Sequence, residues 1–305
     1  MTIVLPEEIR SNTEGMMNLA KIFGECSSCL DSEIRFDCSQ LNFFDAGLCA
    51  MLGVILAKMR AAGKRLSIDG RVVMIDMFKA NNFYEFGIKG NRGEKPEIER
   101  IGFVNKLFFP YWNYGNAEAK SFIKEYARPF LSLKYVPEMT VAVQERMLES
   151  MGELFNNVKV HAESLEGVFV CGKYSPKRGR LSFTIADAGI GFRERIVRDI
   201  RCEGSDLEAI EWAVSKKNTV RCSAIPGGLG LKLLKEFIYL NRGRLSITSG
   251  RGHWEMNNRS VTRYLFDDPI PGSAITMEVN ALDATRYCLK SEIADEHIQN
   301  GGHND

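Results

Sequence analysis

A carboxylate followed by two glycines stands directly after an apolar run, at Asp187, Gly189 and Gly191. An aspartate at the end of a strand can accept a hydrogen bond from an exocyclic amine. Glycines at this spacing let the backbone pass close to a flat ring, because they carry no side chain. A simple turn after a strand has the same pattern, so these three residues alone indicate little.

A glycine-rich segment, Pro226-Gly-Gly-Leu-Gly-Leu231, opens a predicted helix that extends to Tyr239. A loop of this kind at a helix N-terminus offers unpaired N–H groups and a favourable dipole to a phosphate. It is not a Walker A loop, because no Lys-Ser or Lys-Thr pair follows Gly230. Taken alone, this signal is also weak.

Three polar residues, Glu153, Asn157 and His161, follow one another at a spacing of four. Since a helix turns by about 100° per residue, they form one polar stripe on a predicted helix that begins near Pro137. A solvated helix face would look the same. The opposite stripe is apolar and should face the core; it consists of Met147, Met151, Phe155 and Val158.

The order and spacing of these three features resemble the N, G1 and G2 boxes of the GHKL ATPase superfamily, which includes gyrase, Hsp90, histidine kinases and MutL. The resemblance covers residues 137–280. It implies a two-layer α/β sandwich that binds ATP and Mg²⁺. Strands are expected at Val168–Cys171, Leu181–Ile185, Leu245–Thr248 and Ala274–Val279. The last two lie in segments that resemble the closing strands of the family.

The resemblance also implies roles for single residues. Asn157 would bind Mg²⁺, Asp187 would read adenine with help from Ser273, and Glu153 matches the general base of hydrolysing members. The segment Gly191–Gly227 would form a lid over the nucleotide, with an ordered helix at Asp206–Val214. The other residues expected around the nucleotide are His161, Gly189, Gly191, Thr219, Gly227, Gly228, Leu229, Gly230 and Leu231.

The first hundred residues alternate between strand and helix patterns. Strands are predicted at Glu33–Cys38 and Lys64–Ile68, with a helix at Ala46–Ala62 between them. Short joints between strand, helix and strand imply a parallel crossover and therefore an α/β layer. The segment Gly87–Pro96 is rich in glycine, proline and charge and is the best candidate for a linker.

The segment from Arg35 to Leu48, followed by the apolar helix, resembles a STAS domain, a family that includes anti-anti-sigma factors. Members switched by phosphorylation carry Asp-Ser-Ser-Gly at this turn, whereas this chain has Phe44-Asp45-Ala46-Gly47. Ala46 has no hydroxyl, which excludes a phosphoserine switch there. Asp45 either mimics a constant charge or, as we favour, forms the turn.

These resemblances divide the chain into a STAS-like domain at 1–100, a connecting segment at 101–135, an ATP-binding domain at 136–282 and a flexible tail at 283–305. With 305 residues, 45% of them hydrophobic, the chain has material for two domains. Its net charge of +1 gives no reason to expect nucleic acid or an anionic membrane as a partner.

The beginning of the sequence has no pattern of a secretion signal, and the longest apolar stretch, Leu48–Met59, is too short to span a bilayer. We therefore expect a cytoplasmic protein. The eight cysteines are scattered, as is typical of buried thiols in a reducing compartment. Cys26 and Cys29 form the only close pair, and no second pair exists to complete a zinc site.

No histidine precedes His161, so a histidine kinase with its own phosphoacceptor is disfavoured. Gyrase, MutL and Hsp90 place a transducer domain after the ATP domain, for which few residues are left. The sequence favours an ATP-driven regulatory switch with slow hydrolysis. Two alternatives stay open: a serine/threonine kinase of the anti-sigma type acting on a separate STAS-like partner, and a nucleotide-binding scaffold. A protein partner is expected in either regulatory role, and a homodimer is open.

Overall fold

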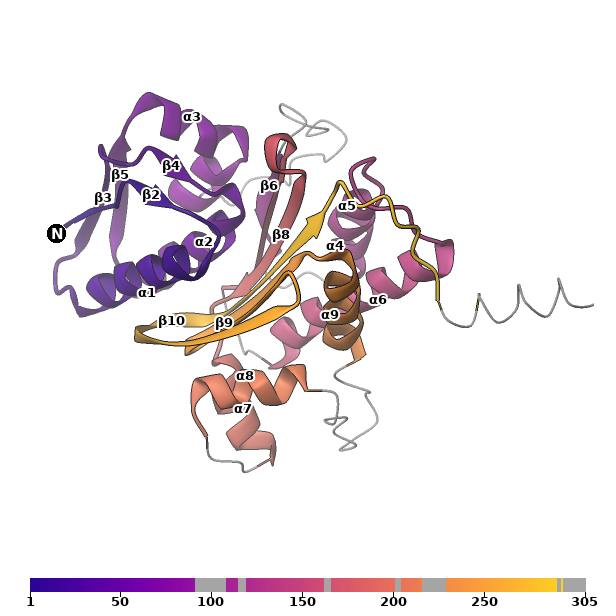
Figure 1. Cartoon of the computed structure of the whole chain (residues 1–305). Coiled ribbons are helices and arrows are strands. Elements are labelled where there is room, and N and C mark those ends of the chain that lie inside the picture. Colours follow the sequence, from indigo (N-terminus) through magenta and orange to yellow (C-terminus); the bar gives the residue numbers. More distant parts are fainter. Residues whose placement is uncertain are drawn as a thin grey trace, which may run out of the picture.

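A computed structural model describes residues 1–90, 108–114, 119–161, 166–200, 204–215, 229–289 and 292, and gives no side-chain detail for 158–161, 198–200 and 229–230. These residues form a mixed α/β protein with three sheets (Figure 1). No helix within the described ranges has the length and apolar character needed to cross a membrane. Two units can be distinguished, an N-terminal unit at 1–90 and a C-terminal unit at 108–289.

The N-terminal unit is built on a parallel sheet of three strands in the order β1-β3-β5. Its predicted crossover is confirmed: β3 (Glu33–Cys38) continues through α2 (Cys49–Ala61) into β5 (Arg65–Gly70), and the two strands pair in parallel. The predicted helix start at Ala46 is a short 3-10 turn, η1 (Ala46–Leu48). The remaining elements are β1 (Thr2–Val4), β2 (Glu8–Ile9), α1 (Thr13–Ser28), β4 (Phe43–Phe44), α3 (Val72–Ala80) and the π-helical η2 (Phe83–Ile88).

The C-terminal unit contains a five-stranded antiparallel sheet in the order β6-β7-β8-β10-β9. The four strands expected from the sequence are present, and each is longer than predicted. Their bounds are β7 (Val168–Ser175), β8 (Arg180–Asp187), β9 (Arg244–Asn257) and β10 (Ser260–Asn280). The helices of this unit are α4 (Ala119–Phe122), α5 (Arg128–Leu131), α6 (Val141–His161), α7 (Gly191–Ile200), α8 (Asp206–Val214) and α9 (Leu229–Asn241).

Three expectations about connecting segments were wrong in part. The segment expected only to join the two domains contributes the edge strand β6 (Phe108–Asn113) and the helices α4 and α5. In the supposed linker, Ile88 is buried at the end of η2, although residues 91–96 lie outside the described ranges. Tyr287 of the expected tail packs on Phe237 and donates a hydrogen bond to Asp283 at 2.5 Å. Apolar and aromatic side chains in these segments add enough buried surface to hold them on the core.

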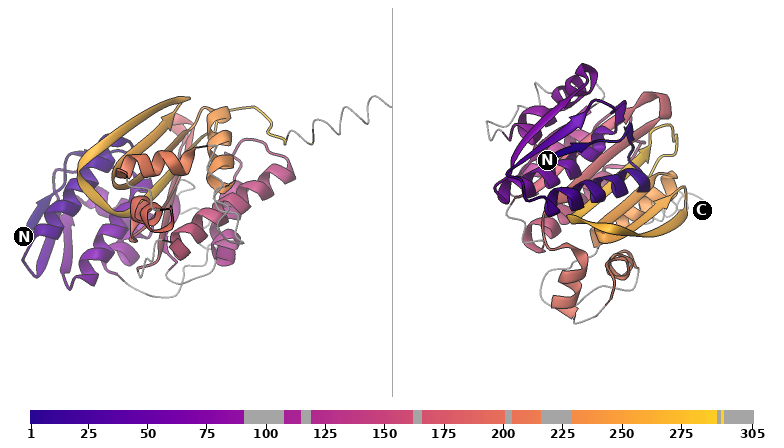
Figure 2. Two further views of the ribbon diagram at one scale, coloured as in Figure 1. Left: turned by 90° about the horizontal axis from the view of Figure 1, so that it is seen from below. Right: turned by 90° about the vertical axis from the view of Figure 1, so that its left-hand side faces the viewer.

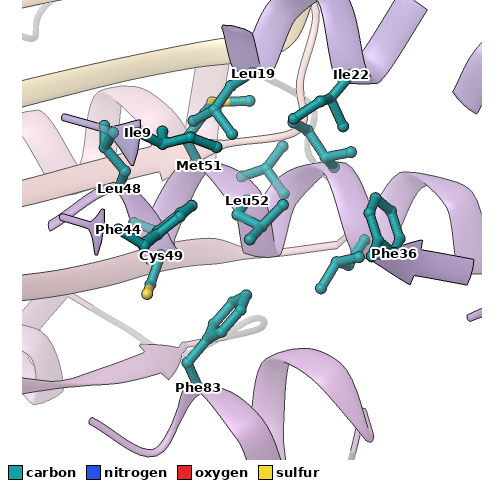
Figure 3. Close-up of a cluster of buried hydrophobic side chains, with 14 of the residues drawn as sticks. Ile9, Leu19, Ile22, Phe36, Phe44, Leu48, Cys49, Met51, Leu52 and Phe83 are labelled. Carbon is teal, nitrogen blue, oxygen red and sulfur yellow. The ribbon is translucent and has the colours of Figure 1, made fainter. Parts of the chain in front are cut away.

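The two faces of the five-stranded sheet are covered by different parts of the chain (Figures 1 and 2). Successive side chains of a strand point to opposite faces, so Val168 and Val170 face the helices α4, α5, α6 and α9. Phe169 and Cys171 of the same strand face the N-terminal unit and belong to its hydrophobic cluster. Figure 3 shows this cluster around α2, where Leu48, Cys49 and other apolar residues converge. One continuous apolar core therefore joins the two units.

Small residues let α2 lie close to the sheet. Ala186, Ala188 and Ala274 belong to the shared cluster, and the backbone of Gly53 in α2 lies directly against the ring of Tyr111. A side chain at Gly53 would collide with that ring. The N-terminal unit is thus fitted to this face of the sheet, as a layer of a single core rather than as a tethered module.

A buried polar network crosses the same interface. Arg244 of β9 is 5% exposed and lies 3.3 Å from Glu255 and 3.5 Å from Glu278. Arg244 also donates a hydrogen bond to the Ser11 hydroxyl of the N-terminal unit at 2.9 Å. Buried charges need such partners, so the network fixes how the two units dock.

Candidate functional site

The carboxyl group of Asp187 lies at the end of β8, on the face of the sheet that carries the helices. Directly opposite it on β10 is Ser273, whose hydroxyl donates a hydrogen bond to Oδ2 of Asp187. The Gly189 N–H donates to Oδ1 at 2.8 Å. Only 1% of Asp187 is exposed, so this is a buried acid held by two donors. The three residues that the sequence placed at one site are therefore in contact.

Burial is the main influence on the acidity of Asp187 and raises its pKa to about 6, because the charged form loses water. The hydrogen bonds from Ser273 and Gly189 oppose this shift by favouring the carboxylate, and the charge of Lys58 does so to a smaller extent. With a pKa of about 6, the carboxyl group is mostly ionised at pH 7 and can accept hydrogen bonds on both oxygens. Perturbed acids of this kind are enriched at functional sites.

Two glycines with positive φ angles shape the backbone around this acid. Gly272 (φ +80°) passes so close to the main chain of Asp187 that an added Cβ would overlap its carbonyl oxygen. Gly191 (φ +79°) lies against Ser249, and a Cβ there would be 2.7 Å from the hydroxyl oxygen. Both positions require glycine for internal packing. Gly191 thus has a structural role besides the ring-lining role that the sequence suggested.

Ser249 and Lys58 were not among the residues predicted for the site. The Ser249 hydroxyl accepts a hydrogen bond from the Phe192 N–H at 2.9 Å and donates one to the Gly272 carbonyl at 3.3 Å, which ties the start of α7 to the strand ends. Lys58 comes from α2 of the N-terminal unit and pairs with Glu166 at 3.6 Å. Sequence gave no signal for Lys58, because only the docking of the two units brings it near Asp187.

The polar stripe on α6 is placed as expected relative to the core. Met147, Met151 and Phe155 are buried, whereas Glu153 and Asn157 are half-buried. Neither residue is a hydrogen-bond partner of the Asp187 carboxyl, whose partners are Ser273 and Gly189. The backbone of His161 ends the helix, and the side chains of His161 and Val158 lie outside the described part. The helix begins at Val141, four residues after the predicted start at Pro137.

The expected lid contains two helices, α7 and α8. The prediction of a helix at Asp206–Val214 is confirmed, with Ser205 and Glu208 forming a capping box at its N-terminus. Asp206 accepts a hydrogen bond from the Arg251 N–H at 2.9 Å, so α8 is docked on β9.

The glycine-rich segment is only partly visible. Thr219, Gly227 and Gly228 lie outside the described residues, and for Leu229 and Gly230 only the helical backbone at the start of α9 is described. The side chain of Leu231 is 7% exposed and packs in the core beneath the sheet. Leu231 therefore anchors the helix, and only its backbone is available to a ligand.

The turn that resembles the STAS switch is buried between the two units. Oδ1 of Asp45 accepts a hydrogen bond from the Gly47 N–H at 3.1 Å and caps η1, which agrees with the turn-forming interpretation. Ala46 is 1% exposed. Ser182 and Thr184 of β8 lie next to Gly47, so this turn packs on the sheet of the C-terminal unit.

Comparisons with known proteins add no identification, since no family model and no curated protein matches this sequence.

Proposed function

We propose that the protein binds ATP in a site of the GHKL type and acts as a regulatory switch with slow ATP hydrolysis. One observation carries the proposal: the buried Asp187 carboxyl and the Ser273 hydroxyl meet at facing strand ends, next to two glycines that admit no side chain. The strand that bears Asp187 lies between a polar helix stripe and a glycine-rich helix start in the order that the resemblance requires. We propose the STAS-like and GHKL-like assignments of the two units on the same grounds.

The residues at this site fit the chemistry of an adenine edge. Each carboxylate oxygen has about two lone-pair directions, and Asp187 uses one of them on each oxygen for Ser273 and Gly189. The carboxylate thus keeps acceptor capacity for an exocyclic amine. The side chain lies on the face of the sheet that α6 and α9 cover, so a ligand bound there would lie between the sheet and these helices.

Asn157 and Glu153 supply the groups for the phosphate end of the ligand. The amide oxygen of Asn157 is a suitable ligand for Mg²⁺, which would neutralise charge on the phosphates. The Glu153 carboxylate would orient a water molecule and take its proton as the water attacks the γ-phosphorus, so that ADP is the leaving group and inorganic phosphate is released. Transfer to a hydroxyl of a separate STAS-like protein is the second candidate, and it needs the same positioned base.

The shared core bears on how such a switch would work. Because the N-terminal unit is packed on the sheet through apolar residues and Arg244, ATP is not expected to release it. Lys58 of α2, in the N-terminal unit, places a positive charge that acts on the Asp187 carboxyl of the C-terminal unit. We therefore expect the two units to stay packed together when ATP binds.

The proposed activity can be tested with Mg²⁺ and ATP labelled on the γ-phosphate. Purified protein should release labelled phosphate slowly, and Glu153→Gln should reduce the rate by roughly 100-fold while ATP still binds. The matched control is Glu149→Gln, one turn earlier on α6, where an exposed carboxylate pairs with Arg146 at 3.3 Å. That variant should retain the wild-type rate. Label on a host protein in added lysate, without phosphate release by the protein alone, would favour the kinase. Nucleotide binding without either reaction would favour the nucleotide-binding scaffold without turnover.

Nucleotide affinity should depend on pH in the range set by Asp187. The ionised carboxyl is the stronger acceptor, and with a pKa of about 6 it is mostly protonated at pH 5. Affinity for Mg²⁺-ADP should therefore fall by about tenfold between pH 7.5 and pH 5, as expected for a group about one unit above the lower pH. Calorimetric titrations of wild type and Asp187→Asn at both pH values would measure this. Protonation of the nucleotide itself would affect both proteins, and the Asn variant shows the size of that effect. An equal fall of affinity in both proteins would therefore contradict the role of Asp187 as the adenine reader.

A further inference from the structure

A cleft between the two units carries an excess of positive charge. Its volume is about 140 Å³, several times the roughly 10–15 Å³ that one water molecule needs. Both units contribute to it. The residues that line it are Arg10, Phe43 and Asp45 of the N-terminal unit and Lys173, Ser175, Arg178, Arg180, Ser182 and Glu278 of the C-terminal unit. Four of these side chains are cationic and two are acidic.

The acidic groups nearby are already engaged by other partners. Glu278 lies 3.5 Å from Arg244 and 4.0 Å from Arg180, and Asp45 caps its own turn. Outside the cleft, Glu8 pairs with Arg10 at 2.7 Å. Among the residues that the structure describes, no carboxylate lies within ion-pair distance of Lys173 or Arg178. These two cations are therefore the least compensated charges of the cleft.

The ring of Phe43 holds two cations of the cleft close to each other. The Arg10 guanidinium lies 4.7 Å from the ring centroid, and the Lys173 ammonium lies 4.9 Å from it. The two charges are thus within about 10 Å, which is roughly one Debye length at 0.1 M salt, so water and salt screen their repulsion only in part. An anion bound beside Lys173 would lower the positive charge that remains in the cleft.

The cleft lies away from the proposed nucleotide site. Ser182 and Glu278 point to the face of the sheet that the N-terminal unit covers, whereas Asp187 points to the opposite face. Asp187 is five positions after Ser182 along β8, which is roughly 17 Å at about 3.3 Å per residue. A ligand in the cleft and a ligand at Asp187 would therefore not compete.

We propose that this cleft binds a phosphate group, with Lys173 and Arg178 as its principal ligands and Arg10 and Arg180 at its rim. Arginine and lysine are the side chains that bind phosphate best, and the Ser175 hydroxyl is a further donor on the lining. Because the lining comes from both units, an anion there would stabilise their docking. The inference does not rest on the proposed ATP site.

The test is a titration of the full chain with inorganic phosphate and, separately, with glycerol 2-phosphate, at constant ionic strength set by chloride. The double variant Lys173→Gln/Arg178→Gln should bind at least tenfold more weakly than wild type. The control Lys21→Gln/Arg146→Gln removes the same charge from exposed sites on α1 and α6 and should bind like wild type. Amide chemical shifts of Ser175 and Ser182 should follow the titration.

The two ligands distinguish the sources of the phosphate. Binding of both would indicate that the phosphate group alone is recognised, and binding of glycerol 2-phosphate alone would indicate an organic phosphate ester. Saturating Mg²⁺-ADP should leave the affinity unchanged. The proposal is overturned if neither ligand binds, if both double variants lose affinity equally, or if ADP displaces the phosphate. The first two outcomes do not bear on whether ATP binds at Asp187.

Discussion

Asp187→Ala is expected to weaken the binding of Mg²⁺-ADP by roughly 100-fold, because it removes a buried charged acceptor worth about 2–3 kcal/mol to its partner. The same change should not lower the free energy of unfolding at pH 7.5. The pKa of this acid is raised from 3.8 to about 6, so ionising the buried carboxyl opposes folding. The protonated carboxyl stabilises the folded state fully below pH 3.8, and this stabilisation is lost as the pH rises through 6. Calorimetry and urea unfolding of the same samples would measure both effects.

Ser273→Ala and Thr276→Ala form a matched pair of hydroxyl deletions on β10. The Ser273 hydroxyl donates to Asp187, so its loss should weaken nucleotide binding by about tenfold. The Thr276 hydroxyl is equally buried and shares a hydrogen bond of 2.9 Å with Thr184, on the other face of the sheet. Its loss should leave affinity unchanged. Equal effects of the two deletions would show that the site is sensitive to strand packing in general rather than to the acid at Asp187.

Arg244→Met should have the largest effect on stability and lower the free energy of unfolding by about 3 kcal/mol, because it takes the guanidinium away from the buried carboxylate of Glu255 and the half-buried carboxylate of Glu278. Burial tends to raise the pKa of Glu255, but the hydrogen bond from His253 and the charge of Arg244 outweigh it, and the pKa is lowered. The stabilising contribution is present above the ordinary pKa of 4.5 and is lost as the pH falls through the lowered value.

The control for this change is Arg146→Met, which removes an exposed guanidinium that pairs with Glu149 at 3.3 Å on α6. Exposed pairs contribute little, so stability should change by less than about 1 kcal/mol. Urea unfolding followed by tryptophan fluorescence would compare the two variants. Arg244 joins the units through Ser11, so a small loss for Arg244→Met would mean that the polar network does not fix their docking.

Local pattern was sufficient where a residue's role is set by its own strand or helix. The buried face of α6, the presence of the strand β7, the parallel crossover of β3 and β5, and the helix at Asp206–Val214 follow from local sequence patterns and short connections. Asp187 and Ser273 were paired through the family resemblance, although 86 positions separate them. Periodicity alone contains no information about that distance.

Other features were decided only by tertiary packing. The strand β6 was missed because its sequence, Phe-Phe-Pro-Tyr-Trp-Asn, contains a proline that argues against a strand, which is tolerated here because β6 is at the edge of the sheet. Lys58 and Lys173 gained their neighbours Glu166 and Phe43 only when the N-terminal unit docked on the sheet. Local sequence patterns do not predict such docking, because it depends on the fit of two surfaces that are built by residues far apart in sequence. The sequence by itself therefore determined the elements and the candidate nucleotide residues, and the packing of the two units decided the shared core, the charge near Asp187 and the cationic cleft.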